Sequence, residues 1–230
     1  MWKIIAAAAA TAATAHGLGF GVGAFGGVAL PEGDLAAQDG RVIGYGSLEG
    51  GDAGSSAAWG GKALASITPA LGVEFAVAYH PNHGTKNWEE HRWLDEPKLT
   101  LVPITLGGRY SFAVGTGRVY VGAGGGYFLE TVGLYGGWGA AESFIARGDV
   151  NINAPGAYVA AGLTYRLGKL ELEAGPRVIE VWNKGEYDYT YEVTKIFPPT
   201  FETEVRSADI YKGFNDRFIN VLVGVNYYFL

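Results

Sequence analysis

Residues 219–229 read INVLVGVNYYF, and the pattern of this stretch predicts the class of fold. An apolar or aromatic residue stands at every second position: Ile219, Val221, Val223, Val225, Tyr227 and Phe229. Because successive side chains of a β-strand point to opposite faces, this period of two predicts a strand with one apolar face. A strand of roughly ten residues is also long enough to cross a lipid bilayer at a tilt.

The same alternation recurs in seven further segments. They are residues 18–24, 59–68, 73–80, 102–112, 119–129, 159–167 and 170–182. The connections between these strands alternate between long and short. Long ones are expected at 31–58, 81–98, 131–155 and 183–216, and short ones at 69–71, 113–117 and 168–169.

This alternation of connections predicts an architecture. Barrels of the outer membrane close their periplasmic ends with tight turns and carry long loops outside. Every backbone polar group in lipid must be paired within the protein, so strands can span only as a closed sheet. We therefore predict an all-β, antiparallel, closed transmembrane β-barrel of about eight strands, with long extracellular loops and short periplasmic turns. A soluble lipocalin-like barrel is the alternative fold.

The composition excludes several classes of protein. Hydrophobic residues make up 48% of the 230 residues, which is too many for a disordered chain. No apolar run approaches the roughly 18 residues of a transmembrane helix. The absence of Cys from the sequence excludes thiolate catalysis and Cys-based metal sites. A net charge of −6 argues against a nucleic-acid binder, which needs a basic face.

The first residues have the features of an export signal. Lys3 supplies a positive n-region, an Ala-rich apolar stretch follows, and an A-x-A cleavage site ends at Ala15. We predict a cleaved signal peptide at 1–15 and a single barrel domain at 16–230. The alternative is an N-terminal helix, since Ala is the best helix former.

Aromatic residues stand near the predicted strand ends, where amphipathic rings favour the two membrane interfaces. The outer girdle is expected to contain Trp59, Tyr79, Tyr127 and Trp182. The periplasmic girdle is expected to contain Tyr110, Phe112, Tyr165, Tyr227 and Phe229. The alternative is that aromatic residues simply favour strands.

The other face of the strands carries charges of both signs. The residues concerned are Lys62, Glu74, Arg109, Arg118, Glu130, Arg166, Glu171, Glu173 and Arg177. An eight-stranded barrel is barely wide enough inside for side chains, so we expect these charges to pair into a hydrogen-bonded plug. A hydrated ion path lined by the same residues is the alternative.

The long segment 183–216 has an alternating pattern of its own, interrupted by two prolines. It predicts a hairpin that continues the last two strands beyond the membrane. A tyrosine-rich face and a free edge would offer a surface protein partner a docking surface by strand addition. The candidate docking residues are Tyr187, Tyr189, Tyr191 and Phe201. An inert, stiff loop is the alternative.

Three histidines lie in or beside one predicted outer loop. His80, His83 and His91 are weak candidates for a metal site, because His with a nearby carboxylate can bind a metal or act as a base. Their spacing is loose, and the sequence contains no G-x-S-x-G or H-E-x-x-H motif. We therefore expect no catalytic residue, no cofactor and no resident metal.

Four stretches carry a family resemblance: 28–34 (VALPEGD), 103–106 (PITL), 120–127 (YVGAGGGY) and 224–229 (GVNYYF). They resemble the small outer-membrane β-barrel proteins of the OmpA/OmpX-like family, over nearly the whole mature chain. The resemblance implies recognition of the C-terminal strand by the barrel assembly machinery. It also implies a protruding sheet at the cell surface.

These expectations converge on an integral protein in the outer membrane of a Gram-negative-type bacterium, with a structural or surface-interaction role. Its partners would be the lipid bilayer and lipopolysaccharide, whose phosphates divalent cations can bridge to the net acidic long segments. The alternative is a narrow porin-like channel, and a lipid-modifying enzyme is the third hypothesis.

Overall fold

A computed structural model describes residues 19–32, 54–83, 99–138, 144–197, 200–212 and 215–229. The described residues form ten β-strands. They are β1 (Gly19–Glu32), β2 (Ser56–Ser66), β3 (Leu71–His83), β4 (Leu99–Val114), β5 (Gly117–Trp138), β6 (Phe144–Leu167), β7 (Leu170–Val181), β8 (Gly185–Phe197), β9 (Thr200–Lys212) and β10 (Asp216–Tyr228). The predicted signal peptide at 1–15 lies outside the described residues.

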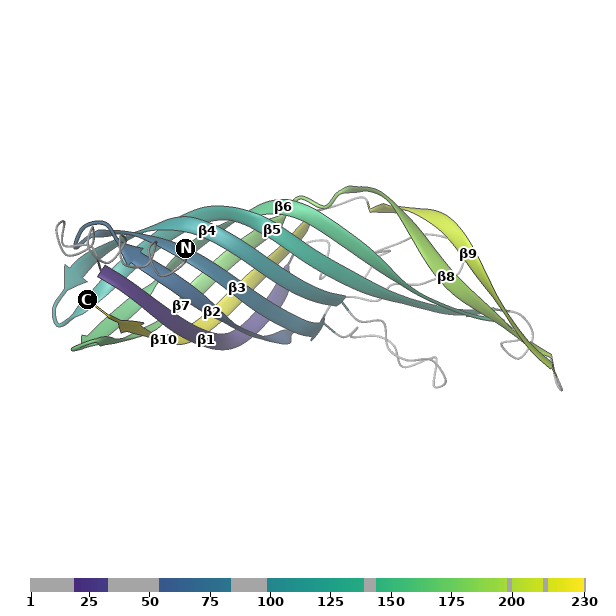
Figure 1. Cartoon of the computed structure of the whole chain (residues 1–230), viewed down its shortest axis with the longest axis horizontal. Helices are drawn as coiled ribbons and strands as arrows, with labels where there is room; N and C mark the ends of the chain where they lie inside the picture. Colours follow the sequence, from purple (N-terminus) through teal and green to yellow (C-terminus); the bar gives the residue numbers. More distant parts are fainter. Residues whose placement is uncertain are drawn as a thin grey trace, which may run out of the picture.

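Eight of these strands close into a ring (Figure 1). β1 to β7 pair in sequence order, and β10 completes the circle by pairing with β7 on one side and β1 on the other. Every pairing is antiparallel, and Phe25 of β1 faces Gly224 of β10 at the closure. The prediction of a closed antiparallel barrel of about eight strands is therefore confirmed.

No helix among the described residues is long and apolar enough to cross a membrane.

The two faces of the ring follow the alternation in the sequence. Side chains such as Val221 and Val223 of β10 point outward and are about half exposed, whereas their neighbours Asn220 and Leu222 are buried in the lumen. All nine residues of the two predicted aromatic girdles are likewise exposed on the outer face. A row of exposed apolar side chains around a closed barrel is the surface that faces lipid.

Two strands are much longer than the sequence pattern indicated. We predicted a loop at 131–155, but β5 and β6 continue to pair through most of it, from Leu129↔Asn153 out to Trp138↔Phe144. The correction has a simple cause, because polar residues such as Asn151 and Asn153 occupy the outward face there. A segment beyond the lipid needs no apolar outer face, so its strand pattern is weaker in the sequence.

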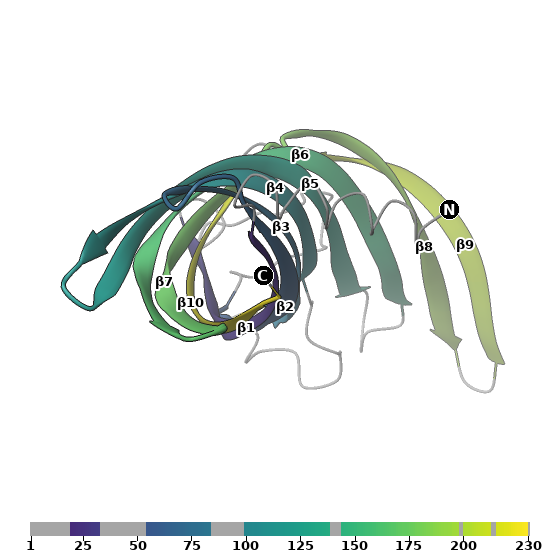
Figure 2. The same ribbon diagram turned by 60° about the vertical axis from the view of Figure 1, so that its left-hand side comes forward.

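β8 and β9 form the predicted hairpin, which extends away from the ring (Figures 1 and 2). Asp216 pairs with Val181 in the barrel, and Gly185 pairs with Lys212 in the hairpin, so the register of β7 with β10 carries over unchanged. β8 also pairs with the outer end of β6, through Phe144 to Gly148. At about 3.3 Å per residue, the hairpin reaches roughly 40 Å.

Lumen-facing glycines make room for aromatic rings. Gly124 of β5 lies beneath Tyr158 of β6, and a Cβ at position 124 would stand 2.7 Å from the ring carbon Cε1 and 2.6 Å from the Cα of Gly107. Tyr120 packs over Gly162 in the same way. These glycines therefore serve close packing inside a narrow barrel and do not leave a cavity beneath the rings.

We expect Gly124→Ala to lower the free energy of unfolding of the barrel by about 1–3 kcal/mol, because the new methyl group meets backbone that cannot move aside. Gly108→Ala is the matched control, since a Cβ at that position would have nothing within 4 Å. It should change stability by no more than about 0.5 kcal/mol. Urea titration in detergent micelles measures both, and equal losses would contradict this account.

Candidate functional site

A network of ion pairs crosses the barrel interior, and Glu173 of β7 is its centre. The Lys62 ammonium from β2 forms an ion pair with Glu173. Arg109 Nη1 from β4 donates to Glu173 Oε2 over 2.8 Å. Asn226 Nδ2 from β10 donates to the same oxygen over 3.1 Å. Residues from four strands on different sides of the ring therefore meet at one carboxylate.

Two further carboxylates complete the network. Glu171 Oε1 accepts a hydrogen bond from the Tyr228 hydroxyl at 3.2 Å and lies 3.5 Å from Arg109 Nη2. Glu74 of β3 pairs with Arg177 of β7 and lies 3.6 Å from the Lys62 ammonium. The network is charge-balanced, because three cations face three carboxylates: Lys62, Arg109 and Arg177, and Glu74, Glu171 and Glu173.

These six charges are removed from solvent. The Lys62 side chain is 1% exposed, and that of Arg177, the most exposed of the six, is 11% exposed. Two tyrosine rings cover the guanidinium groups, with Arg109 3.9 Å from the centre of the Tyr120 ring and Arg177 4.5 Å from that of Tyr158. Cation–π contacts of this kind replace part of the lost hydration. The described side chains therefore fill the lumen at this level.

Three charges of the predicted set lie outside this network. Arg118 donates to the carbonyl oxygens of Pro69 and Ser111, at the periplasmic mouth. Arg166 is exposed at the same mouth, where its guanidinium lies 4.8 Å from the centre of the Tyr228 ring. A small cavity of about 50 Å³ separates these arginines from the network.

Glu130, the third of these charges, lies at the opposite, outer end and is 1% exposed. Asn183 Nδ2 donates to Glu130 Oε2 at 2.5 Å and to Asp216 Oδ2 at 2.6 Å. The Asp216 backbone N–H in turn donates to Asn183 Oδ1 at 3.0 Å. This amide thus ties the ends of β7 and β10 to β5, at the point where the hairpin leaves the ring.

The uncharged partners in the mid-barrel network and around Glu130 were not predicted from the sequence. Asn226 and Tyr228 share the inward parity of β10, and Asn183 is the second residue after β7. Their parity was available from the sequence, but only the tertiary structure shows which charges they reach. Tyr120 and Tyr158 were missed for the same reason, since an aromatic residue at an inward position of a barrel gives no signal of its partner.

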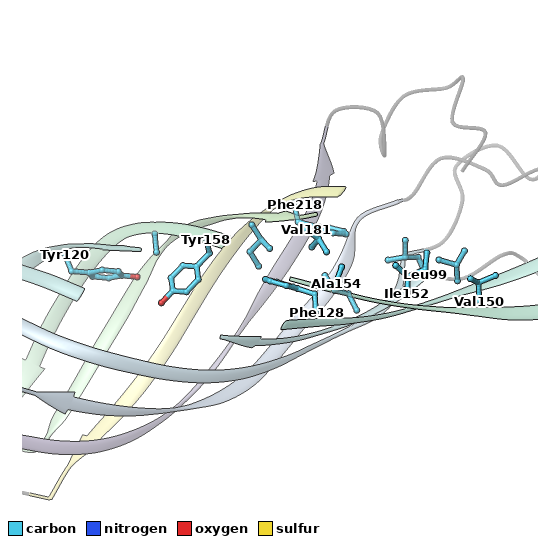
Figure 3. Close-up of a cluster of buried hydrophobic side chains, with 13 residues drawn as sticks. Leu99, Tyr120, Phe128, Val150, Ile152, Ala154, Tyr158, Val181 and Phe218 are labelled. Carbon is cyan, nitrogen blue, oxygen red and sulfur yellow. The ribbon is translucent and has the colours of Figure 1, made fainter. Parts of the chain in front are cut away.

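An apolar cluster lines the barrel between the six-charge network and the Glu130–Asn183 contacts, and continues beyond Glu130 (Figure 3). It contains Phe128, Ile152, Ile179 and Phe218, each no more than 1% exposed. The cluster runs from Tyr120 and Tyr158, deep in the barrel, outward to Leu99, Val150 and Ile152 at the far end. It supports the base of the hairpin.

The hairpin presents different residues from those that we predicted. Tyr187 and Tyr191 are half-buried and pack against the apolar cluster, and the Tyr187 hydroxyl donates to the Asn183 carbonyl at 2.6 Å. The prediction of an open tyrosine face is corrected, because this face continues the interior of the barrel. Nothing is described of the Tyr189 side chain. Phe201 and Val205 of β9 lie on the opposite face, 71% and 66% exposed.

The face that carries Tyr187 also holds the hairpin together by charge. Glu204 of β9 forms ion pairs with Arg206 beside it and with Lys195 across the strand pair, the latter at 3.3 Å. The hydrogen bonds from Arg206 and Lys195 lower the pKa of the Glu204 carboxyl below its usual range. The cluster therefore keeps its charges at mildly acidic pH.

Of the three candidate histidines, only His80 has a side chain within the described residues. His80 is fully buried in the lumen, beside Phe218 and 3.4 Å from Asn220 Nδ2. The side chain of His83 and the whole of His91 lie outside the described residues. Among the residues that are described, no group of three or more His, Asp or Glu side chains is placed to hold a metal ion.

Solved structures with the same fold are proteins of the outer membrane. A major outer membrane protein from Thermus thermophilus superposes with a TM-score of 0.56 at 13% identity, covering 92% of this chain and 99% of that one. Neisserial surface protein A superposes with a TM-score of 0.50 at 15% identity, covering 90% and 96%. Neither a protein-family model nor a curated protein sequence matches this chain.

The chain thus has the fold of small outer-membrane β-barrels. Its exposed apolar belt is the surface that such a barrel presents to lipid, so the chain is an integral protein of the outer membrane.

We expect Glu173→Ala to lower the free energy of unfolding by about 3–5 kcal/mol, because it leaves Lys62 and Arg109 buried without their main partner. Glu180→Ala is the matched control. Glu180 pairs with Arg217 at 2.9 Å, but both side chains are more than a third exposed, so this loss should be at most about 1 kcal/mol. Urea unfolding in lipid vesicles compares the two, and similar losses would contradict the importance of the network.

Proposed function

We propose that this protein is a closed outer-membrane barrel that anchors a rigid β-sheet outside the cell, and that this sheet binds a partner at the surface. The observation that carries the proposal is the continuous register from β7 and β10 into the hairpin. The ring is already complete without β8 and β9, so 26 strand residues of the hairpin serve no spanning purpose.

The closed lumen supports an anchoring role over transport. Ions that cross a narrow barrel need a wetted path lined by polar groups. Here the polar groups at mid-barrel bind one another, through Glu173, Glu74 and their cations, and are buried. The channel hypothesis requires this network to open, and we propose that it stays closed in the resting protein.

The outer sheet supports a binding role. β5, β6, β8 and β9 pair beyond the ring, and β9 is an edge strand whose outer backbone groups face no other described strand of the sheet. Phe201 and Val205 stand exposed on β9, and Glu192 is exposed on the same face, opposite Val205. A strand added at this edge would place alternate side chains beside Phe201 and Val205, and the others beside Glu202 and Glu204 on the opposite face, which favours an extended partner segment that is apolar and basic in alternation.

The proposal includes partners in the envelope. The acidic face of the hairpin, with Glu186, Asp188 and Glu192, continues the lipid-facing side of the barrel. Divalent cations there would bridge to lipopolysaccharide phosphates. We further propose kinship with the OmpA/OmpX-like barrels, assembly through the C-terminal strand by the barrel assembly machinery, and a function without chemistry of its own.

The conductance of the folded chain in a planar bilayer tests the closed lumen. We expect no current steps from the unaltered chain after insertion has been verified. Arg109→Ala and Glu74→Ala each remove a network member and should introduce small, reproducible steps. Steps of equal size from the unaltered protein would instead establish the channel hypothesis.

Binding of designed peptides tests whether the edge of the outer sheet binds an extended partner segment. Immobilised ten-residue peptides of alternating Lys and Val, or of alternating Glu and Val, are presented to the folded chain in nanodiscs. We expect the basic peptide to bind, and the double variant Phe201→Ser/Val205→Ser to bind it about tenfold more weakly, as loss of about 1.4 kcal/mol implies.

Thr190→Ala is the control, because Thr190 is exposed on the same face as Val205 but lies on β8, one strand away from the edge. Equal binding of both peptides, or an unchanged affinity of the Phe201/Val205 variant, would refute the proposed surface.

A further inference from the structure

The β4–β5 hairpin leans away from the barrel wall at the periplasmic end (Figure 2, teal). Pairing of β5 with β6 ends at Arg118↔Thr164, whereas β6 continues to Leu167 before it turns into β7. This pairing reaches within one residue of the start of β5, so β6 runs on past the end of β5, and a groove of about 420 Å³ lies there on the outer side of the sheet. Its volume falls within the range of about 300–1,000 Å³ that is usual for small-molecule sites.

The groove is apolar and lies at the membrane interface. Its walls include Val114 and Val119 of the hairpin, and Leu163 and Leu172 of β6 and β7. Tyr165, one of the periplasmic girdle residues, also lines it. Rings of this kind lie at the level of lipid headgroups, so the groove opens at the boundary between the acyl chains and the periplasm.

The rim beside the groove is positively charged. Arg118 lines both the groove and the cavity at the barrel mouth, and the exposed residues Arg166 and Lys169 lie at the adjoining β6–β7 turn. Two carboxylates lie near this rim: Glu173 lines the groove and Glu171 lines the mouth cavity, but their side chains are only 9% and 7% exposed and both are bound to Arg109. Among the described residues, the exposed charge at this rim is therefore entirely basic.

We propose that the groove and rim together bind one anionic phospholipid of the inner leaflet. One acyl chain lies against Leu163 and Leu172, and the headgroup phosphate lies toward Arg166 and Lys169. Basic residues beside a membrane surface attract anionic lipids, with each cation contributing about fivefold in affinity. The apolar groove supplies the chain contact that a charged rim alone lacks. A zwitterionic lipid offers no net negative charge to the rim, so it binds more weakly.

Native mass spectrometry of the full folded chain in detergent tests this proposal. Phosphatidylglycerol and phosphatidylcholine with identical acyl chains are titrated, and bound lipid is counted. We expect one tightly bound phosphatidylglycerol, weakened about fivefold for each cation removed in Arg166→Ala and Lys169→Ala. Lys184→Ala and Arg217→Ala, at the outer end, are the charge-matched controls and should leave the lipid bound.

A second pair of variants tests the contribution of the groove to lipid binding separately from that of the basic residues. Ala174 lines the groove, so Ala174→Trp should fill it and displace the lipid without altering any charge. Ala63→Trp places the same side chain on the lipid-facing side of β2, away from the groove, and should retain the lipid. Equal affinity for the two lipids would overturn the proposal, and so would full retention of phosphatidylglycerol by Ala174→Trp. Heat-dependent gel mobility verifies that each variant has folded.

Discussion

The pairing of backbone polar groups inside lipid is the constraint on which the structure depends. Water is absent there, so each N–H and C=O must find a partner within the sheet. A sheet meets this condition only when its first and last strands join, as β1 and β10 do over twelve consecutive residue pairs. Ring closure turns the sheet inside out relative to a soluble protein, because the apolar side chains face outward and the polar ones are enclosed.

Enclosure then determines what the interior must contain. Charges that lose water need partners of opposite sign, good geometry and further hydrogen bonds. The barrel meets this need with equal numbers of cations and carboxylates, with Asn226 and Tyr228 as neutral donors, and with tyrosine rings over the guanidinium groups. The glycines beneath those rings leave the space that the rings occupy. A Cβ at Gly124 or Gly162 would collide with the tyrosine ring above it, so these two positions of the wall carry no side chain.

Beyond the membrane the requirement for closure ends, and the two ends of the molecule diverge. At the outer end, β5 and β6 continue and accept β8 and β9, so the sheet extends past the ring and ends in an open edge at β9. The apolar cluster and the Asn183 contacts hold this sheet to the ring, which makes it a rigid extension. At the periplasmic end the turns are short, and an apolar groove lies beside a basic rim where β6 runs on past the end of β5. The outer end therefore presents an acidic surface, and the periplasmic end presents a basic one.

The alternation of apolar and polar residues was enough to predict the strands, the closed antiparallel ring and the inward or outward direction of each side chain in the membrane, because a period of two is a local property of the sequence. Residues 219–229 sufficed to show it. The same parity, a purely local property, placed Lys62, Glu74 and Arg109 inside the barrel. The pairing of individual charges, the placement of Glu130 and Arg118 at opposite ends and the inward packing of Tyr187 and Tyr191 follow from the three-dimensional arrangement of the strands. Those outcomes depend on the stagger between strands far apart in the chain, and no local pattern encodes that stagger.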